Sequence, residues 1–300
     1  MEVHLSDAER VFIVHGVQEG IRNDGRGASD YRPIRVETGV LSTTLGSARV
    51  RLASTDVLVG VKAEIDEIDC KQTEKKGRIR FFVDCSANAT PLFAGKGGEE
   101  MAEFVSTALT DAYSNSMALD LSKLVVSTTK AWTVFVDVVV LECGGNLTDA
   151  AALGAKAALA DARLANVRIK ASDSEKSEIE LTDDAYFDSW QLDVTAAPLL
   201  VTVNKIGWSN VVDASLQEEV CTKSALVVGV ASSPAKGDLV TLVRQTGRGS
   251  LEPDSVDEMI ALGVRAGNSL NRELDRILVD IGRTQMNRNE LVSAAGFLSS

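Results

Sequence analysis

The feature that most constrains the fold is a change of pattern near the middle of the chain. Residues 132–141 are mostly β-branched and apolar, which predicts a long strand, and this run breaks at Gly144 and Gly145. Residues 147–164 follow and are rich in alanine, which predicts a helix. Small side chains allow close approach between layers, so this order predicts a helix packed tightly on a sheet.

Further strand-like segments lie on both sides of this pair. They are β-branched, partly alternating and separated by turn residues, as expected for strands of a half-buried sheet. The four before it span residues 34–40, 48–53, 57–65 and 79–86, and the four after it span residues 199–205, 208–213, 225–231 and 239–245.

Three more helices are predicted from their ends and periodicity. Ser6 and Glu9 form a capping-box pattern that precedes a short amphipathic helix. A second helix fits residues 99–113, and a third opens near Pro253 and is predicted to end at Gly282. Residues 171–193 are polar and acidic, which indicates a solvated connector with one short strand. The whole pattern predicts a two-part α+β protein.

Composition excludes several classes of function. The net charge of −12 argues against a broad nucleic-acid-binding surface, because such binding depends on Lys and Arg that neutralise phosphates. The four cysteines are widely spaced, which predicts neither a zinc site nor disulfides and indicates a reducing compartment. The apolar runs are too short to span a bilayer. We therefore expect no metal, no cofactor and no membrane contact.

An ordered set of motifs resembles the RNase PH family. The set comprises Asp24-Gly25-Arg26, Arg32-Pro33-Ile34, Gly46 to Val50, Thr55 to Lys62, Leu141 to Asn146, Val212 to Glu219 and Gly247 to Leu251. Each motif is weak alone, but their order is similar to that in ring subunits of the RNA exosome. The resemblance implies an RNase PH fold (ribosomal protein S5 domain 2-like) of two βαβ-type subdomains packed together. The implied divisions are an N-terminal helix and arm (1–27), domain 1 (28–195), domain 2 (196–282) and a C-terminal tail (283–300).

Active members of this family use phosphate to cleave RNA from its 3′ end, and their phosphate-binding turn reads Gly-Gly-Thr-Arg. Here the turn reads Gly144, Gly145, Asn146, Leu147, so the arginine is replaced by an aliphatic side chain. Asn146 is a predicted N-cap, with Asp149 completing a capping-box-like pair. A carboxylate about 5 Å from a phosphate repels it by roughly 3 kcal/mol at an effective dielectric constant near 20. The loop is therefore interpreted as degenerate.

The acidic and basic positions implied by the resemblance are also altered. Asp213 and Glu219 match acidic positions of the family, but Ser215 replaces a second aspartate, so we interpret them as vestigial groups, partly buried near a strand end. The helix at 99–113 contains no Lys or Arg where archaeal relatives carry RNA-binding arginines. These changes predict that the chain has no catalytic residues.

One basic cluster remains between two predicted strands. Its members are Lys71, Lys75, Lys76, Arg78 and Arg80. By resemblance this cluster lies at a hairpin tip near the narrow entrance of the ring, where it would guide RNA; the alternative is an ordinary solvated loop. Arg49 and Arg51 are expected on an exposed strand face or in an interface ion pair. His15 is expected on the polar side of its helix, and Trp132, Trp190 and Trp208 in the core or an interface.

The sequence therefore predicts a non-catalytic structural subunit of the RNA exosome core ring. The expected partners are other RNase PH-type ring subunits, cap subunits, and RNA threaded through the assembled channel. The alternatives are an active phosphate-dependent 3′-to-5′ exoribonuclease and a free-standing RNA-binding module. The resemblance to eukaryotic subunits implies the nucleus (nucleolus) and cytoplasm, whereas an archaeal origin implies the cytoplasm.

Overall fold

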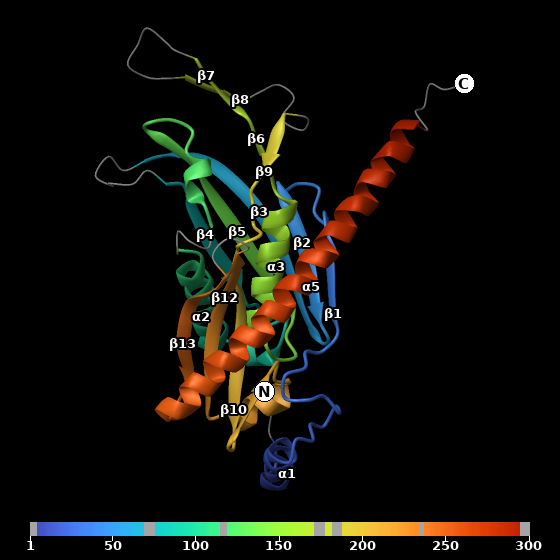
Figure 1. Cartoon of the computed structure of the whole chain (residues 1–300), viewed down its shortest axis with the longest axis vertical. Coiled ribbons are helices and arrows are strands. Elements are labelled where there is room, and N and C mark those ends of the chain that lie inside the picture. The colour runs from blue at the N-terminus through green and yellow to red at the C-terminus, as the bar shows by residue number, and fades with distance from the viewer. Residues whose placement is uncertain are drawn as a thin grey trace.

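The structure is a computed structural model, and it describes residues 5–68, 76–114, 119–170, 178–181, 188–233 and 237–294. Four layers follow one another (Figure 1): a five-stranded sheet, two helices, a four-stranded sheet, and the long C-terminal helix. The first sheet has the order β1-β2-β3-β5-β4 and the second has the order β11-β10-β12-β13.

The first two layers are built from residues before 162. The strands are β1 (Ile34–Thr38), β2 (Gly46–Leu52), β3 (Thr55–Glu67), β4 (Arg78–Asp84) and β5 (Lys130–Glu142), and the helices are α2 (Lys96–Tyr113) and α3 (Leu147–Asp161). The other two layers contain β10 (Leu199–Ile206), β11 (Ser209–Val212), β12 (Ser224–Ser233), β13 (Gly237–Gly247) and α5 (Pro253–Ala294). Short elements complete the chain: α1 (Asp7–Gln18), α4 (Leu216–Cys221), η1 (Pro91–Phe93), η2 (Leu121–Leu124), β6 (Arg163–Ala165), β7 (Val167–Lys170), β8 (Glu178–Leu181) and β9 (Ser189–Gln191).

Helix α3 is the centre of the core, and it packs closely on a sheet, as its alanines predicted. Thirteen of its 15 residues are buried, because it contacts β2 and β3 on one side and β10 on the other. A Cβ at Gly154 would lie 2.7 Å from Val59 Cγ2, which shows how closely the helix approaches the first sheet. Residues with larger side chains on these faces would separate the layers.

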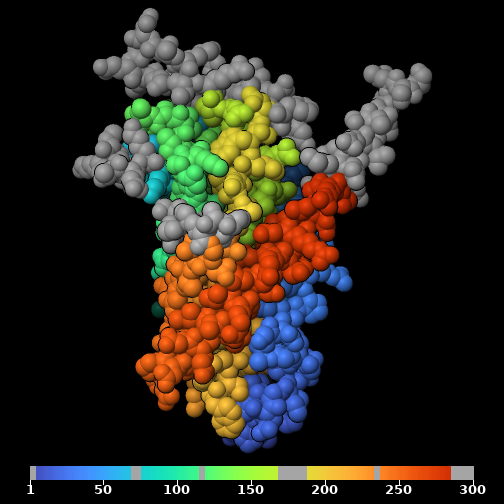
Figure 2. Space-filling view, in the orientation of Figure 1, coloured from blue at the N-terminus to red at the C-terminus, as the bar shows by residue number. Residues whose placement is uncertain are grey.

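Helix α5 covers the outer face of the second sheet, and Figure 2 shows it running diagonally across this side of the molecule. Gly263 and Gly267 allow it to lie against Val228 and Val230 of β12. Near its middle α5 meets α3, where the fully buried Lys156 donates to Asn271 Oδ1 at 2.9 Å. Burial lowers the pKa of Lys156, and Asp275 Oδ1 at 3.3 Å partly opposes this shift.

Several element boundaries differ from the sequence-based prediction. Helix α5 does not end at Gly282 but continues to Ala294, because one interior glycine costs a helix only about 1 kcal/mol. Helix α3 ends at Asp161, and the residues expected to extend it form β6, which pairs with β9. The connector at 171–193 contains β8 and β9 rather than one short strand. Helix α4 was not predicted, since six residues carry too little periodicity.

The surroundings of the basic residues differ from the prediction in two ways. Helix α2 begins at Lys96, three residues before the predicted start, so it does carry one lysine in its first turn. Strands β3 and β4 do not form a hairpin, because β5 lies between them and β4 pairs parallel with β5. β3 and β4 are therefore antiparallel to each other without being neighbours. Among the described strands, β4 and β5 are the one parallel pair, so the second sheet is antiparallel throughout.

No helix in the described ranges is long and apolar enough to cross a membrane.

Candidate functional site

The candidate site is the turn at Gly144 and Gly145, which joins β5 to α3. Gly145 has φ +99°, and a Cβ there would lie 2.6 Å from the backbone nitrogen of Leu216. The Thr55 hydroxyl donates to the Gly145 carbonyl at 2.6 Å and accepts from the Gly144 amide at 3.0 Å. The Leu216 amide donates to the Gly144 carbonyl at 3.2 Å. The turn is thus held between the start of β3 and the start of α4.

Asn146 precedes α3 but does not cap it in the predicted way. Its backbone is left-handed (φ 56°), and its side chain accepts no hydrogen bond from the first turn of the helix. The amide Nδ2 instead donates to Asp149 Oδ2 and to Asp213 Oδ1, both at 2.9 Å. Its backbone N–H donates to Glu219 Oε1 at 2.7 Å rather than to Asp149. The predicted capping-box pair is therefore wrong, because tertiary partners take both side chains.

Asp149 joins three parts of the structure. It is fully buried and accepts hydrogen bonds from the Tyr31 hydroxyl at 2.7 Å, from the Thr202 amide at 2.8 Å and from the Thr202 hydroxyl at 2.7 Å. Burial raises its pKa to about 6, although these hydrogen bonds favour the ionised form. Asp149 thus links α3 to Tyr31 and to β10.

Three arginines from residues 22–32 reach this region. Arg32 forms a bidentate pair with the fully buried Asp213, with Nε 2.9 Å from Oδ2 and a terminal nitrogen 2.7 Å from Oδ1. The same guanidinium donates to the carbonyls of Gly144 and Gly145 at 3.0 and 3.1 Å. Arg26 donates to Asp213 Oδ2 at 3.0 Å. Although burial opposes ionisation, the hydrogen bonds and charge of Arg32 hold the pKa of Asp213 below its ordinary value.

The third arginine, Arg22, neutralises a separate carboxylate. Its Nε lies 2.9 Å from Glu218 Oε1 and its Nη2 lies 2.6 Å from Glu218 Oε2, with both side chains buried. It also donates to the carbonyls of Val212 and Asp213. The sequence predicted no role at this site for Arg22, Arg26 or Arg32. The acidic run 213–219 could have indicated that arginines lie here, because buried carboxylates require cationic partners.

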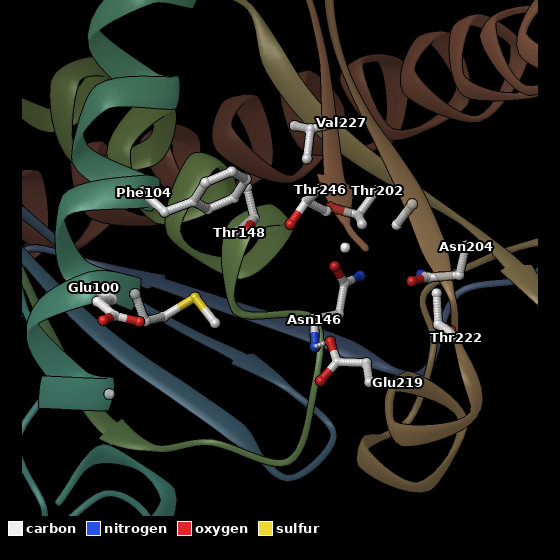
Figure 3. Close-up of a pocket in the computed structure, with 14 residues that line it drawn as sticks. Glu100, Phe104, Asn146, Thr148, Thr202, Asn204, Glu219, Thr222, Val227 and Thr246 are labelled. Atoms are coloured by element: carbon white, nitrogen blue, oxygen red, sulfur yellow. Dashed lines mark hydrogen bonds between the residues drawn. The ribbon is translucent and has the colours of Figure 1, made fainter. Parts of the chain in front are cut away.

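A cavity of about 440 Å³ lies beside the turn, between α2 and the inner face of the second sheet (Figure 3). Its lining includes Gly97, Glu100, Met101, Phe104, Asn146, Thr148, Thr202, Asn204, Glu219, Thr222, Ala225, Val227, Thr246 and Gly247. None of these described lining residues is Lys or Arg, and two are glutamates. A neutral-to-acidic lining of this kind disfavours a bound phosphate.

Glu219 is the ionisable group that connects the cavity with the turn. Desolvation raises its pKa to about 7, although the hydrogen bond from the Asn146 amide and the charge of Arg32 act in the opposite direction. Asp149 and Asp213 contribute further repulsion. The carboxyl group therefore changes its charge near neutral pH in a position that faces any cavity ligand.

The raised pKa predicts how Glu219→Gln changes stability with pH. Because the folded-state pKa exceeds the unfolded value, the folded state binds more protons between about pH 4.5 and 7, so Glu219 makes the wild type less stable as pH rises through this range. Glu219→Gln removes this contribution, and we expect its stability relative to wild type to increase from pH 4.5 to pH 7.5. Urea unfolding at four pH values measures the difference.

Glu218→Gln is the control with the opposite sign. Despite desolvation, hydrogen bonds from Arg22 and from Ser215 lower the pKa of Glu218, so its stabilising contribution is present above the unfolded pKa and is lost as pH falls. Its deficit relative to wild type should therefore be larger at pH 7 than at pH 4. Parallel pH profiles for the two variants would contradict at least one of the two assignments.

The described residues of the basic cluster lie at or beside β4 and do not line the cavity. Lys71 and Lys75 lie outside the described residues. Arg78 and Arg80 belong to β4, an edge strand of the first sheet, and Lys76 lies two residues before its start. Arg80 is exposed, whereas Lys76 and Arg78 are half-buried.

The remaining candidates take structural positions. Arg49 and Arg51 both pair with Asp56 of this chain, at 2.7 and 3.0 Å, on the outer face of the first sheet. His15 is exposed on α1. Trp132 is buried, and Trp208 is exposed at the β10–β11 turn. Within the described ranges, no group of three or more His, Cys, Asp or Glu side chains is placed to hold a metal ion.

Comparisons with known proteins agree with the predicted fold. Residues 30–165 match the model of the 3′ exoribonuclease family, domain 1 (RNase_PH), and residues 196–266 match domain 2 of that family. A solved structure described as an Archaeoglobus fulgidus exosome with RNA bound to the active site superposes with a TM-score of 0.74 and 26% identity, covering 89% of this chain and 98% of that chain. A structure described as an archaeal exosome core gives a TM-score of 0.71 at 26% identity, covering 90% of this chain and 97% of that chain.

Similar proteins in sequence carry related names. The putative exosome complex exonuclease RRP42 of Dictyostelium discoideum is 32% identical over 92% of this chain and 98% of that protein. The exosome complex component Rrp42 of Thermococcus kodakarensis is 33% identical over 94% of this chain and 98% of that protein. Both the predicted α+β class and the RNase PH fold are confirmed, and the chain belongs to the RNase PH (3′ exoribonuclease) family.

Proposed function

We propose that this chain is a non-catalytic structural subunit of an RNA exosome core ring, which supports 3′-to-5′ RNA processing and degradation by helping to form the channel. The proposal rests on the partners of the arginines near the turn. Arg22, Arg26 and Arg32 are all engaged by carboxylates, and the cavity beside the turn has glutamates instead. Phosphorolysis needs a cationic, donor-rich seat for phosphate, because negative charge develops there in the transition state.

The turn itself supports the same conclusion. Its two carbonyl oxygens already accept hydrogen bonds from Thr55, Leu216 and Arg32, and the Asn146 amide donates to Glu219. These groups hold the loop in place for the fold, and the bond to Glu219 makes the Asn146 N–H unavailable to an anion. Asp213 and Glu219 are then vestigial, since acidic groups without a phosphate nucleophile have nothing to assist.

The partners follow from the relatives, whose names place them in the exosome. The proposed neighbours are RNase PH-type ring subunits, including one of the catalytic ancestral type, together with cap subunits. RNA would pass through the assembled channel, with Arg78, Arg80 and the lysines before them as candidate contacts. The proposed location is the nucleus, including the nucleolus, and the cytoplasm of a eukaryotic cell.

Two measurements test the proposal. The full chain, incubated with single-stranded RNA and inorganic phosphate, is expected to release no nucleoside diphosphates above background. Co-expression with an RNase PH-type subunit that carries an intact Gly-Gly-Thr-Arg turn is expected to move the chain into a ring-sized species on size exclusion. The active exoribonuclease is the competing function, and phosphate-dependent release by the isolated chain would support it.

A Glu219→Gln variant distinguishes real activity from contamination. If diphosphate release is observed and is lost in this variant, the chain is an enzyme and the structural proposal is wrong. If release is unchanged in the variant, it comes from a contaminating nuclease. A chain that stays monomeric beside the competent partner subunit would overturn ring membership, whatever its activity.

A further inference from the structure

We propose that the free edge of strand β1 pairs with the same strand of a second copy of this chain, so that the first sheets of the two copies form one continuous sheet across a twofold axis. The inference concerns the free chain and does not depend on membership of a ring. It rests on the position of β1, on the order of its charges and on the incomplete burial of its apolar side chains.

Strand β1 is an edge strand of the first sheet. Its one neighbour among the described strands is β2, and Figure 1 shows β1 at the side of the molecule. An edge strand presents backbone N–H and C=O groups along its outer side, and these groups are a template for another strand. Five residues, Ile34–Thr38, form this edge.

The solvent-facing side of β1 carries one charge of each sign. Arg35 and Glu37 are both exposed, and neither forms an ion pair with a described residue. Within the chain Arg35 lies opposite Arg51, which is a like charge, and Glu37 lies opposite Arg49. Both of these β2 arginines are already paired with Asp56. The charges of β1 are therefore available to a partner.

The order of these charges specifies how a second copy binds. In an antiparallel pair centred on Val36, Arg35 of each copy lies opposite Glu37 of the other copy, which gives two attractive pairs. A pair centred on Arg35 or on Glu37 would place like charges opposite each other. A shift by one residue would set solvent-facing side chains against core-facing ones. Charges on an edge strand usually keep other strands away, whereas this order attracts a second copy in one register.

The core-facing side of β1 is incompletely covered. Val36 lies opposite the fully buried Val50, and Ile34 lies opposite the fully buried Leu52, but Val36 and Ile34 are themselves only half-buried. In the pair centred on Val36, the two Val36 side chains lie opposite each other, and Ile34 lies opposite Thr38 of the second copy. Burial of this apolar surface adds to the backbone hydrogen bonds between the two strands.

The size of the contact sets the expected affinity. The pair is isologous, because the same patch of each copy contacts its counterpart. A stable interface usually has about 20–30 residues on each side, and β1 offers five. We therefore expect a weak, concentration-dependent dimer. The net charge of −12 on each copy opposes association, but a Debye length of about 8 Å at 0.15 M salt screens most of this repulsion.

Sedimentation velocity of the full chain at about 0.15 M salt, over concentrations from about 2 to about 200 µM, tests the proposal. We expect the average mass to rise from that of the monomer toward that of the dimer. Arg35→Glu and Glu37→Arg should each weaken dimerisation at least about tenfold, because each places like charges opposite each other in both pairs. Both side chains are exposed, so both variants are expected to fold.

An equimolar mixture of the Arg35→Glu and Glu37→Arg chains should dimerise again, because every pair then joins opposite charges. The matched control is Arg80→Glu, which reverses an exposed charge on β4 at the other edge of the same sheet. It should leave dimerisation unchanged. A wild-type chain that stays monomeric throughout would overturn the proposal. Dimers that survive both β1 reversals, a mixture that stays monomeric, or an equal loss in Arg80→Glu would overturn it too, because β1 would then not pair in this register.

Discussion

Replacing Arg32 with alanine is expected to lower the free energy of unfolding by about 3–5 kcal/mol, because the change leaves a buried carboxylate short of its main partner. Asp213 is fully buried, and Arg32 gives it two side-chain hydrogen bonds and one from the backbone. The same guanidinium also holds the carbonyls of Gly144 and Gly145. Urea or guanidinium unfolding of the purified chain measures the loss.

Two further variants show whether the loss of stability comes from the pair of Arg32 and Asp213. Arg35→Ala removes an exposed arginine from the neighbouring strand β1, and it should change stability by about 0.5 kcal/mol or less. The double variant Arg32→Ala, Asp213→Ala removes both charges, and it should be less destabilised than the sum of the two single variants. If Arg32→Ala costs no more than Arg35→Ala, the arginine is not the main partner of Asp213.

The second large effect is expected for Gly145→Ala, with a loss of about 2–5 kcal/mol from backbone strain and overpacking together. The φ angle of +99° disfavours any residue with a Cβ. The new methyl group would also lie 2.6 Å from the Leu216 nitrogen and 2.9 Å from the Ala214 carbonyl oxygen, which are backbone atoms with little freedom to move. Denaturant unfolding measures the change.

Gly25→Ala separates the two causes. Gly25 also has a positive φ, +76°, but no atom lies within 4 Å of its Cβ position. Its substitution should cost only the backbone contribution, about 1–2 kcal/mol. Equal losses at Gly25 and Gly145 would show that close packing between the turn and α4 contributes nothing.

The strands and long helices were predictable because their patterns are local. Residues 132–141 were predicted as a strand and lie within β5 (Lys130–Glu142), and the predicted helix start at residue 147 is the first residue of α3. The alanines of α3 also predicted that it packs closely on a sheet, but not that a second sheet covers its other side. Less was predictable where a pattern is short: α4 and β6 have six and three residues, and their partners lie far away in the sequence.

The candidate site was also only partly predictable from the sequence, because many of its contacts join residues far apart in the chain. Replacement of the family's arginine by Leu147 could be read directly from the sequence. The amide of Asn146 was expected to cap α3, but in the fold it donates to two carboxylates, one of them 67 positions away. The expected absence of cations near the turn was also incomplete, because Arg32 lies 112 positions before Gly144 and still contacts it.

By itself, then, the sequence determined the succession of strands and helices, the tight packing of the alanine-rich helix and the missing cation in the turn, since each depends on side chains close together in the chain. Only the tertiary structure decided which carboxylates are neutralised by Arg22, Arg26 and Arg32, and that Asn146 and Asn204 line one cavity. Those outcomes depend on burial and on distances between residues far apart in sequence, and local propensity carries no information about either.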